Sequence, residues 1–148
     1  MGLPDHVLKT LKKLGYETPT QIQTKVIPRM MSGQDIIGQA QTGTGKTAAC
    51  ALPVISKIAL KRKEPQCLVL APTRELAIQV ADSFNKYAAG LKGFQALVIY
   101  GGQPMWIQLK QLKYGPHVIV GTPGRISDHL RNGSLKLDGV KTAILDEA

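Results

Sequence analysis

Apolar residues along the chain follow two different spacings, which separate an N-terminal helical segment from a longer segment of alternating strands and helices. A first amphipathic helix is predicted from apolar positions at helical spacing, namely Leu3, Val7, Leu8, Leu11 and Leu14. Gly15 follows where a left-handed residue commonly ends a helix. A second, short helix is expected after Pro19, with Thr20 as its N-terminal cap and Pro28 as the residue that interrupts it.

From Asp35 onward, short apolar runs alternate with longer helical patterns. Strands are predicted at residues 35–40, 67–71, 95–100, 117–121 and 142–146. Helices are predicted at residues 47–60, 75–87, 105–112 and 126–130. This alternation favours an α/β fold with a parallel sheet and helices on both faces. Residues that follow the strands should then meet at the carboxyl edge of the sheet.

The composition is that of one globular domain with an excess of positive charge. The chain has 148 residues, of which 43% are hydrophobic, and its 19 Lys and Arg residues outnumber 10 Asp and Glu residues. A net charge of +9 favours a polyanionic partner, although a well-solvated basic surface explains it equally well. The dense run "KRKE" at residues 61–64 is interpreted as a solvated loop.

The sequence contains no membrane span and no signal-peptide core. No stretch approaches the roughly 18 consecutive apolar residues that a span requires. Cys50 and Cys67 lie in apolar segments without metal-ligand spacing and are interpreted as buried, reduced thiols. We therefore expect a cytoplasmic protein with no membrane partner.

The stretch "AQTGTGKT" at residues 40–47 lies between a predicted strand and a predicted helix. In that arrangement backbone N–H groups and the helix N-terminus converge on phosphate oxygens, and Gly43 and Gly45 permit the close approach. Lys46 is placed to reach the β and γ phosphates, and Thr47 offers a hydroxyl to Mg²⁺. Ala40 stands where this pattern usually has glycine. These features predict a loop that binds the phosphates of a nucleotide together with Mg²⁺.

Asp146 and Glu147 follow the last predicted strand, in "AILDEA". An Asp at such a strand end holds Mg²⁺ through its carboxylate, and an adjacent Glu polarises the attacking water. By itself an Asp–Glu pair is also compatible with ordinary polarity at a strand end. Together with the phosphate loop it indicates a nucleotide hydrolase with Lys46, Asp146 and Glu147 as catalytic residues and with Thr47 and Asp146 at the metal.

Several separated stretches occur in the order of the motifs of one family. They are "GYETPTQIQ" at 15–23, "AQTGTGKT" at 40–47, "PTRELA" at 72–77, "GG" at 101–102, "TPGR" at 122–125 and "DEA" at 146–148. They resemble the Q motif, motif I, motif Ia, motif Ib with its companion, and a truncated DEAD box. The chain resembles the first RecA-like domain of a DEAD-box ATP-dependent RNA helicase. The residues within its motifs are most similar to those of bacterial helicases of the DeaD type.

The resemblance implies a RecA-like P-loop NTPase fold and assigns roles to individual residues. ATP binding is implied for Tyr16, Thr18, Gln23, Ala40, Gln41, Thr42, Gly43, Thr44, Gly45, Lys46 and Thr47, with the Gln23 amide reading the adenine edge. RNA binding is implied for Pro72, Thr73, Arg74, Glu75, Gly101, Gly102, Thr122, Pro123, Gly124 and Arg125. Arginines and backbone N–H groups contact phosphates, so this binding is expected to be independent of base sequence and sensitive to salt.

The resemblance also sets the expected domain organisation. Residues 1–148 would be the helicase ATP-binding domain, cut inside the DEAD box, with residues 1–34 as its Q-motif helical unit. The family's upstream aromatic would precede Met1, and the last Asp of the box would be the next residue. A second RecA-like domain with its arginine fingers would lie elsewhere in the parent chain. Because such arginines contribute factors of about 10³ to 10⁵, this chain alone is expected to be nearly inactive.

Two other functions remain open from the residues alone. A small-molecule phosphotransferase would need an acceptor pocket and an Arg-rich lid, and a non-catalytic RNA-binding module would need only phosphate binding. His6, His117 and His129 are interpreted as surface or strand-end residues because none has metal-ligand spacing. Trp106 and Tyr114 could stack on bases, but their spacing with Leu109 and Leu112 favours packing in the core. Thr122 and Pro123 would also suit the capped start of a helix.

Overall fold

The computed structural model describes residues 2–16, 18–36 and 46–146. Contacts within the chain divide it into two compact units. The N-terminal unit consists of Met1–Lys57 together with Lys86–Lys92, and the second unit consists of Ile58–Asn85 together with Gly93–Ala148. The first contains helices α1 to α3, and the second contains a sheet with its covering helices.

Helix α1 (Asp5–Lys13) follows the predicted amphipathic pattern. Its Val7 and Leu11 side chains are buried, and Gly15 adopts a positive φ of 86° after the helix ends. Asp5 lies in the first turn, whereas Lys12 and Lys13 lie in the last, as the helix dipole favours. The first helix and its glycine stop are therefore as the sequence predicted.

Helix α2 (Gln21–Met31) begins as predicted but does not end at Pro28. Thr20 and Gln23 form a capping box, in which each side chain accepts a hydrogen bond from the other residue's backbone N–H. The prediction that Pro28 interrupts the helix is wrong. A proline inside a helix costs about 3 kcal/mol. Val26 and Ile27 are buried at 7% and 0% exposure, and each contributes about 1.5–3 kcal/mol, which offsets that cost.

Helix α3 (Lys46–Lys57) packs against α2 and is tied to it at its far end. The Lys57 Nζ donates a hydrogen bond to the Met30 carbonyl over 2.8 Å. The inward side of α3 is built from small and branched residues, Ala48, Ala49, Ala51, Leu52, Val54 and Ile55, which are all buried. Lys46 is therefore the first residue of a firmly packed helix.

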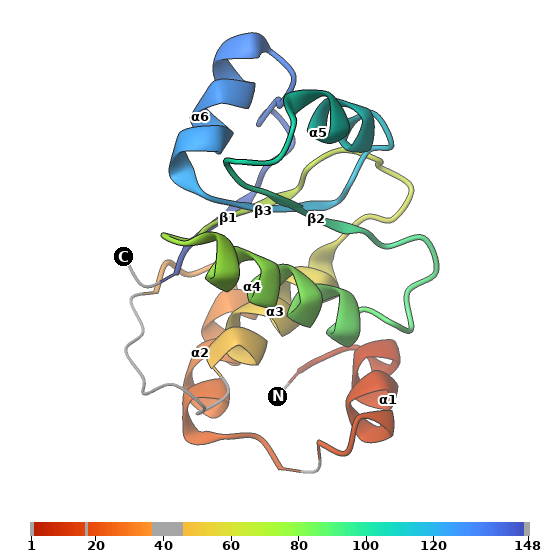
Figure 1. Ribbon diagram of the computed structural model, residues 1–148. Helices are drawn as coiled ribbons and strands as arrows, with labels where there is room; N and C mark the ends of the chain where they lie inside the picture. Colours follow the sequence, from red (N-terminus) through yellow and green to blue (C-terminus); the bar gives the residue numbers. More distant parts are fainter. Residues whose placement is uncertain (1, 17, 37–45, 147–148) are drawn as a thin grey trace. The chain divides into compact units, whose positions relative to one another are not determined.

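The second unit contains a four-stranded parallel sheet in the order β2–β3–β1–β4. The strands are β1 (Cys67–Leu70), β2 (Ala96–Ile99), β3 (Val118–Gly121) and β4 (Thr142–Leu145). Helix α4 (Arg74–Tyr87) lies on one face, and α5 (Met105–Leu112) and α6 (Pro123–Asn132) lie on the other (Figure 1). The predicted α/β class, parallel sheet and two-sided helix cover are confirmed. Of the predicted strand at 35–40, Asp35 and Ile36 lie outside any strand and 37–40 lie outside the described residues.

The core of the second unit lies between the sheet and the α5/α6 layer. One buried cluster joins three strands and α6 through Leu68, Leu97, Ile99, Ile119, Ile126 and Leu135. Every residue of β3 is buried, which fits its place between β2 and β1. Cys67 is buried as predicted, but Cys50 is only half-buried. Because β3 is covered on both faces, its end is held firmly and so fixes where the segment after it begins.

Gly121 ends β3 at a point too crowded for a side chain. A Cβ there would lie 2.6 Å from the Ile126 Cδ1 and 2.7 Å from the Ile99 carbonyl oxygen. We expect Gly121→Ala to lower the free energy of unfolding by about 1–3 kcal/mol, because backbone and core must shift to admit the methyl group. Guanidinium unfolding measures this. Gly124→Ala is the control, since nothing lies within 4 Å of its Cβ position, and equal stability of the two variants would contradict the crowding argument.

Candidate functional site

Three of the predicted binding segments begin side by side at the carboxyl edge of the sheet. Leu70, Ile99 and Gly121 are aligned in register at the ends of β1, β2 and β3. The segments that follow these strands therefore lie along the edge in the order 101–102, 122–125 and 72–75, with Asp146 after β4 next in line. Since neighbouring strands lie about 4.8 Å apart, three strands bring these segments within roughly 10 Å.

The segment after β1 presents one capping residue and one exposed arginine. The Thr73 Oγ1 accepts a hydrogen bond from the Leu76 N–H over 3.2 Å and so caps the start of α4. The Arg74 guanidinium lies over the Tyr100 ring, 5.6 Å from its centroid, and forms a long 3.6 Å ion pair with Glu75. Pro72, before these residues, is exposed. The arginine thus contacts an aromatic ring from the segment after β2 but remains 55% exposed.

The segment after β2 is an exposed glycine turn. Gly101 and Gly102 are both exposed, and Gly102 has a φ of 92°, which disfavours any side chain there. Among the described residues, no heavy atom lies within 4 Å of the position that a Cβ on Gly101 or Gly102 would take. This open backbone is suited to close approach by a polyanion.

Arg125, after β3, belongs to a buried hydrogen-bond network centred on Gln108 of α5. The Gln108 Oε1 accepts from the Arg125 Nη1 over 3.0 Å and from the His129 Nε2 over 2.7 Å. Its Nε2 donates to the Tyr100 carbonyl over 2.8 Å and to the Gln103 Oε1 over 2.9 Å. The Arg125 Nη1 also donates to the Gln103 carbonyl over 2.8 Å. One fully buried glutamine thus links the glycine turn to Arg125.

Sequence patterns do not single out Gln108, and they misplace His129. The interpretation of His129 as a surface or strand-end residue is wrong, because it lies in α6 and is fully buried. His117 is buried too, at the start of β3, while His6 is exposed on α1. The one signal for Gln108 is that it lies four residues before Leu112, on the face of α5 that points to the core.

His129 is held neutral in the fold. Burial and the nearby positive charge of Arg125 lower the pKa of His129, and the Asp128 carboxylate opposes this only in part. The neutral ring donates from Nε2 to Gln108, and its Nδ1 lies 2.8 Å from the Ser134 Oγ. A protonated ring would add a second positive charge beside Arg125.

We expect the stability of the chain to fall as the pH drops through the ordinary histidine range. The unfolded state binds a proton on His129 below about pH 6.5, whereas the folded state, with its lowered pKa, resists protonation, so the free energy of unfolding rises with pH in this window. Guanidinium unfolding at pH 7.5 and pH 5.5 measures the difference. His129→Asn should reduce the pH dependence, and an unchanged pH dependence in that variant would show that other groups cause it.

Helix α6 starts at the predicted residues, but the Thr122 side chain does not form the predicted capping hydrogen bond. Thr122 is the N-terminal cap residue and Pro123 occupies the first turn. The Thr122 side chain makes no capping hydrogen bond, and its backbone N–H donates to the Ile99 carbonyl over 3.0 Å. Pro123 and Gly124 are exposed. The start of α6 is therefore an open helix N-terminus at the edge of the sheet.

The phosphate-loop residues fall largely outside the described residues. Ala40, Gln41, Thr42, Gly43, Thr44 and Gly45 lie there, as does Glu147. Lys46 and Thr47 are described and are the first two residues of α3, whose first turn has no acidic residue. Asp146 is half-buried after β4, and its backbone N–H donates to the Leu70 carbonyl over 2.9 Å.

The predicted adenine-reading residues lie in the N-terminal unit. Gln23 is only 5% exposed, and its Oε1 accepts the Thr20 backbone N–H. Thr18 is exposed. The Tyr16 ring meets Tyr87 edge to face, with hydroxyl oxygens 3.3 Å apart and the Lys86 Nζ 5.6 Å from the Tyr16 ring centroid. The hydrogen bond with Tyr87 lowers the pKa of Tyr16, and burial raises that of Tyr87.

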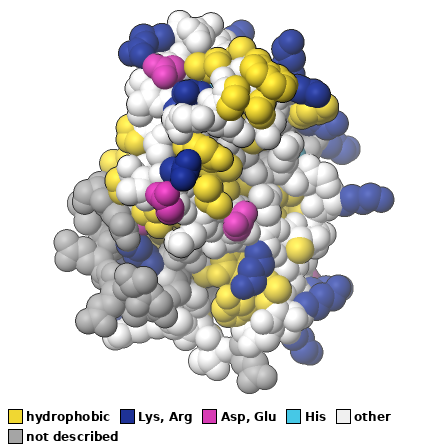
Figure 2. All heavy atoms as spheres, in the orientation of Figure 1, with side chains coloured by type: hydrophobic (Ala, Val, Ile, Leu, Met, Phe, Trp, Pro, Cys, Tyr) yellow, Lys and Arg dark blue, Asp and Glu magenta, His cyan; other side chains and the backbone are white. Residues whose placement is uncertain are grey.

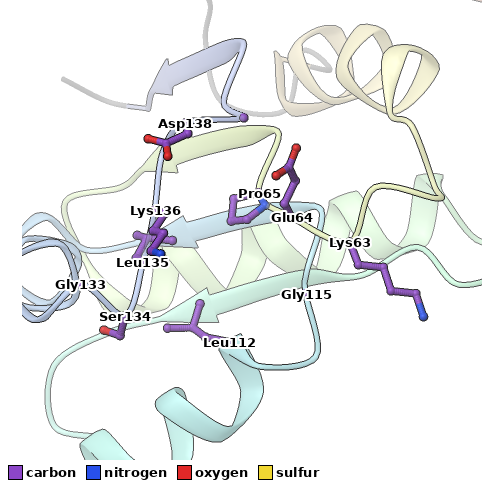
Figure 3. Close-up of a pocket in the computed structure, with 11 residues that line it drawn as sticks. Lys63, Glu64, Pro65, Leu112, Gly115, Gly133, Ser134, Leu135, Lys136 and Asp138 are labelled. Carbon is purple, nitrogen blue, oxygen red and sulfur yellow. The ribbon is translucent and has the colours of Figure 1, made fainter.

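A separate hollow of about 260 Å³ lies at the amino ends of the strands. Its lining comes from loops that precede β1, β3 and β4, among them Glu64, Gly115 and Asp138 (Figure 3). It includes Lys63 of the predicted solvated loop, in which residues 61–63 are exposed and Arg62 pairs with Glu64. The residues that line the hollow include none of the predicted RNA-binding residues, because those follow the carboxyl ends of the strands.

The described residues show basic side chains on the surface and no preformed metal cluster. Figure 2 shows Lys and Arg side chains at many places on one face, with few acidic ones between them. Within residues 2–16, 18–36 and 46–146, no group of three His, Cys, Asp or Glu side chains could hold a metal ion. In the same residues no helix is long and apolar enough to cross a membrane.

The sequence of this chain is similar to a known protein family. The profile of the DEAD/DEAH box helicase family matches residues 20–148. The chain is 51% identical over 148 residues to the ATP-dependent RNA helicase DeaD of Haemophilus influenzae and covers 24% of that relative. It is also 51% identical to the DEAD-box ATP-dependent RNA helicase CshA of Geobacillus kaustophilus and covers 32% of it. The chain thus spans about a quarter to a third of the length of such relatives.

Two solved structures resemble the fold closely. The crystal structure of a DEAD box protein from Methanococcus jannaschii superposes with a TM-score of 0.92 at 42% identity, covering 98% of this chain and 39% of the other. A Saccharomyces cerevisiae dbp5 variant, in a complex with nup159, gle1, ip6 and adp, superposes with a TM-score of 0.87 at 29% identity, covering 97% of this chain and 38% of the other.

Proposed function

Because the chain belongs to the DEAD/DEAH box helicase family, we propose that it is the ATP- and RNA-binding lobe of a longer, ATP-dependent RNA helicase. The parent protein would hydrolyse ATP when RNA is bound and locally separate RNA duplexes. Residues 1–148 would form its first RecA-like domain, with residues 1–34 as the Q-motif unit. The reduced cysteines and the bacterial relatives support a cytoplasmic location.

The observation that carries the proposal is that β1, β2 and β3 end in register at the carboxyl edge of the sheet. An exposed glycine turn, an open helix N-terminus and two arginines follow these strand ends. Backbone N–H groups, a helix N-terminus and arginine side chains can all bind phosphate oxygens, and contacts of that kind carry no direct sequence information. Contact with an RNA backbone through Arg74, Arg125 and the residues beside them would therefore be independent of sequence and weaken steeply with salt.

On the nucleotide side, residues 40–47 would cradle the phosphates of ATP. Lys46 and Thr47 open a helix with no acidic residue in its first turn, which favours a bound anion. Tyr16, Thr18 and Gln23 would form the adenine side, with Gln23 already held by the capping box. The structurally similar dbp5 variant is bound to adp, which supports nucleotide binding in a related fold.

Two of the proposed site residues carry oxygen ligands of the kind that Mg²⁺ binds. Thr47 offers a hydroxyl and Asp146 a carboxylate, and Mg²⁺ binds through one or two such ligands plus phosphates and water. When bound, the ion would neutralise charge on the phosphates. Lys46 would bind phosphate oxygens and Glu147 would orient the attacking water.

The clamp that couples ATP to RNA needs a second RecA-like domain. The relatives are three to four times as long as this chain, which leaves room for that domain. We propose that ATP closes the two domains on single-stranded RNA, and that hydrolysis reopens them. Arginines from the second domain would complete the hydrolytic site, so this chain alone would turn over ATP slowly.

The test is ATP turnover and duplex unwinding by the complete protein and by this chain. We expect RNA to stimulate turnover in the complete protein and this chain alone to show little turnover, with activity restored when the second domain is added. RNA binding without hydrolysis by the complete protein would instead indicate a non-catalytic RNA-binding module. Rapid turnover by this chain alone, indifferent to RNA, would favour a self-contained phosphotransferase or phosphohydrolase.

A further inference from the structure

Helix α5 and the turn that follows it carry two large aromatic side chains for which the sequence favours packing in the core. Trp106 is 67% exposed and Tyr114 is 65% exposed, so the packing interpretation is wrong. The reason is the rotation of the helix. Its buried stripe runs through Gln108, and Trp106, two residues away, is rotated by about 200° to the opposite side.

The exposed positions form one stripe with a consistent chemistry. Trp106 and Lys110 of α5 and Lys113 and Tyr114 of the turn after it are all exposed, and their spacing is i, i+4, i+7 and i+8. Figure 2 shows hydrophobic side chains gathered over the region of α5, with basic side chains beside them. We call these four residues the α5 stripe.

The α5 stripe contains two lysines, and the segment of sequence around it has no acidic residue. No Asp or Glu occurs between Asp82 and Asp128, whereas Lys110 and Lys113 lie in the stripe itself. A protein-binding aromatic patch is usually depleted of lysine at its centre, whereas single-stranded nucleic acid binds where aromatic rings and cations alternate. The composition of the stripe therefore favours a polyanion with stackable bases.

Hydrogen bonds connect α5, which carries the start of the stripe, to the proposed RNA edge. Helix α5 begins three residues after Gly102, and Gln108 on its inner side bonds to the Tyr100 carbonyl and to Gln103. The same Gln108 bonds to Arg125. A strand bound at the glycine turn would thus meet the start of the stripe next.

We propose that the α5 stripe is an accessory binding site for single-stranded RNA, in which Trp106 stacks on a base and Lys110 and Lys113 contact phosphates. This rests on the proposed function and extends its RNA path beyond the motif residues. Because every base has a stackable face, the contact would lengthen the bound strand without selecting a sequence. Tyr114 would provide a second stacking surface at the far end.

Tryptophan fluorescence of the complete protein tests the proposal, because Trp106 is the single tryptophan of this chain. The fluorescence of the Trp106→Phe variant gives the background from any tryptophans elsewhere in the complete protein. Oligouridylate should quench the Trp106 signal, and an abasic oligomer of the same length should not. Trp106→Ala should weaken oligouridylate binding by roughly five-fold or more, Trp106→Phe should keep part of the affinity, and RNA-independent ATP turnover should not change.

Further variants separate stacking from charge and from general surface effects. Lys110→Gln with Lys113→Gln should weaken both oligomers and reduce the salt dependence of binding. Leu8→Ala, which truncates an exposed apolar residue on α1, should leave RNA affinity unchanged. The proposal would be overturned if Trp106→Ala kept full affinity for oligouridylate and if RNA did not quench the Trp106 fluorescence of the unaltered protein. If that protein still bound RNA normally, the helicase assignment would remain intact.

Two other results are equally decisive. Unchanged RNA affinity in Trp106→Ala together with loss of a protein complex would assign the α5 stripe to a protein partner and overturn the proposal. Failure of the unaltered complete protein to bind oligouridylate at all would instead contradict the proposed function, which the stimulation assay detects independently.

Discussion

Replacing Lys46 by alanine should lower the ATP turnover number of the complete protein by about 10²- to 10³-fold, the loss typical of removing one electrostatic contact to the transition state. Lys46 is the first residue of α3. A cation at a helix N-terminus opposes the helix dipole, so this lysine is not there to stabilise the helix. Its proposed role is to bind the β and γ phosphates as charge moves onto them. Steady-state turnover at saturating RNA measures the effect.

A second lysine on the same helix provides the matched control. Lys57 lies in the last turn of α3, where its Nζ donates to the Met30 carbonyl. Lys57→Ala loses that bond and the same charge, but it should leave turnover within about twofold of the unaltered protein, since surface substitutions have small effects. Both variants should keep the thermal midpoint close to that of the parent. Equal activity of Lys46→Ala and Lys57→Ala would remove Lys46 from the catalytic site.

Replacing Gln108 by leucine should lower the free energy of unfolding by about 2–4 kcal/mol and weaken RNA binding at the same time. Gln108 is fully buried and bonds to the Tyr100 carbonyl, Gln103, Arg125 and His129. Leucine fills similar space but leaves a buried His129 N–H and part of the Arg125 guanidinium without their acceptor, which costs about 1–3 kcal/mol for each group. The glycine turn and Arg125 would then lose their common support.

The matched control for Gln108 is Gln111, one turn further along the same helix. Among the described residues the Gln111 Oε1 is a buried atom without a hydrogen-bond partner. Gln111→Leu should therefore be neutral or stabilising by about 1 kcal/mol, because it removes a polar atom that is already unsatisfied. Guanidinium unfolding gives the stabilities, and the RNA concentration for half-maximal ATPase stimulation gives the binding effect.

The RNA requirement distinguishes a positioning residue from a purely structural one. Well below the unfolding transition, Gln108→Leu should raise the half-maximal RNA concentration by about tenfold, or 1.4 kcal/mol of binding free energy, while ATP turnover without RNA stays unchanged. Gln108→Glu keeps an acceptor facing Arg125 and His129 and should recover part of the RNA affinity. A stability loss without any change in the RNA requirement would limit Gln108 to the fold.

The sequence predicted most of the elements because their signals are local. Apolar spacing predicted α1, α4 and α5 to within a residue or two, and short branched runs predicted β1 to β4. Parallel pairing followed from the alternation of strands and helices. The prediction at Pro28 was wrong because the local cost of a proline was weighed without the burial of Val26 and Ile27.

The sequence by itself determined which residues are proposed to bind phosphate, since glycine, lysine, threonine and arginine at fixed offsets from strand ends are the local signal for that chemistry. Only the tertiary structure decided how neighbouring residues divide between core and surface. Trp106 lies outside and Gln108 inside because contacts with other elements, β2 and the more distant α6, fix the rotation of α5. A helix of eight residues with both polar and apolar residues on each side has no local signal strong enough to choose that rotation.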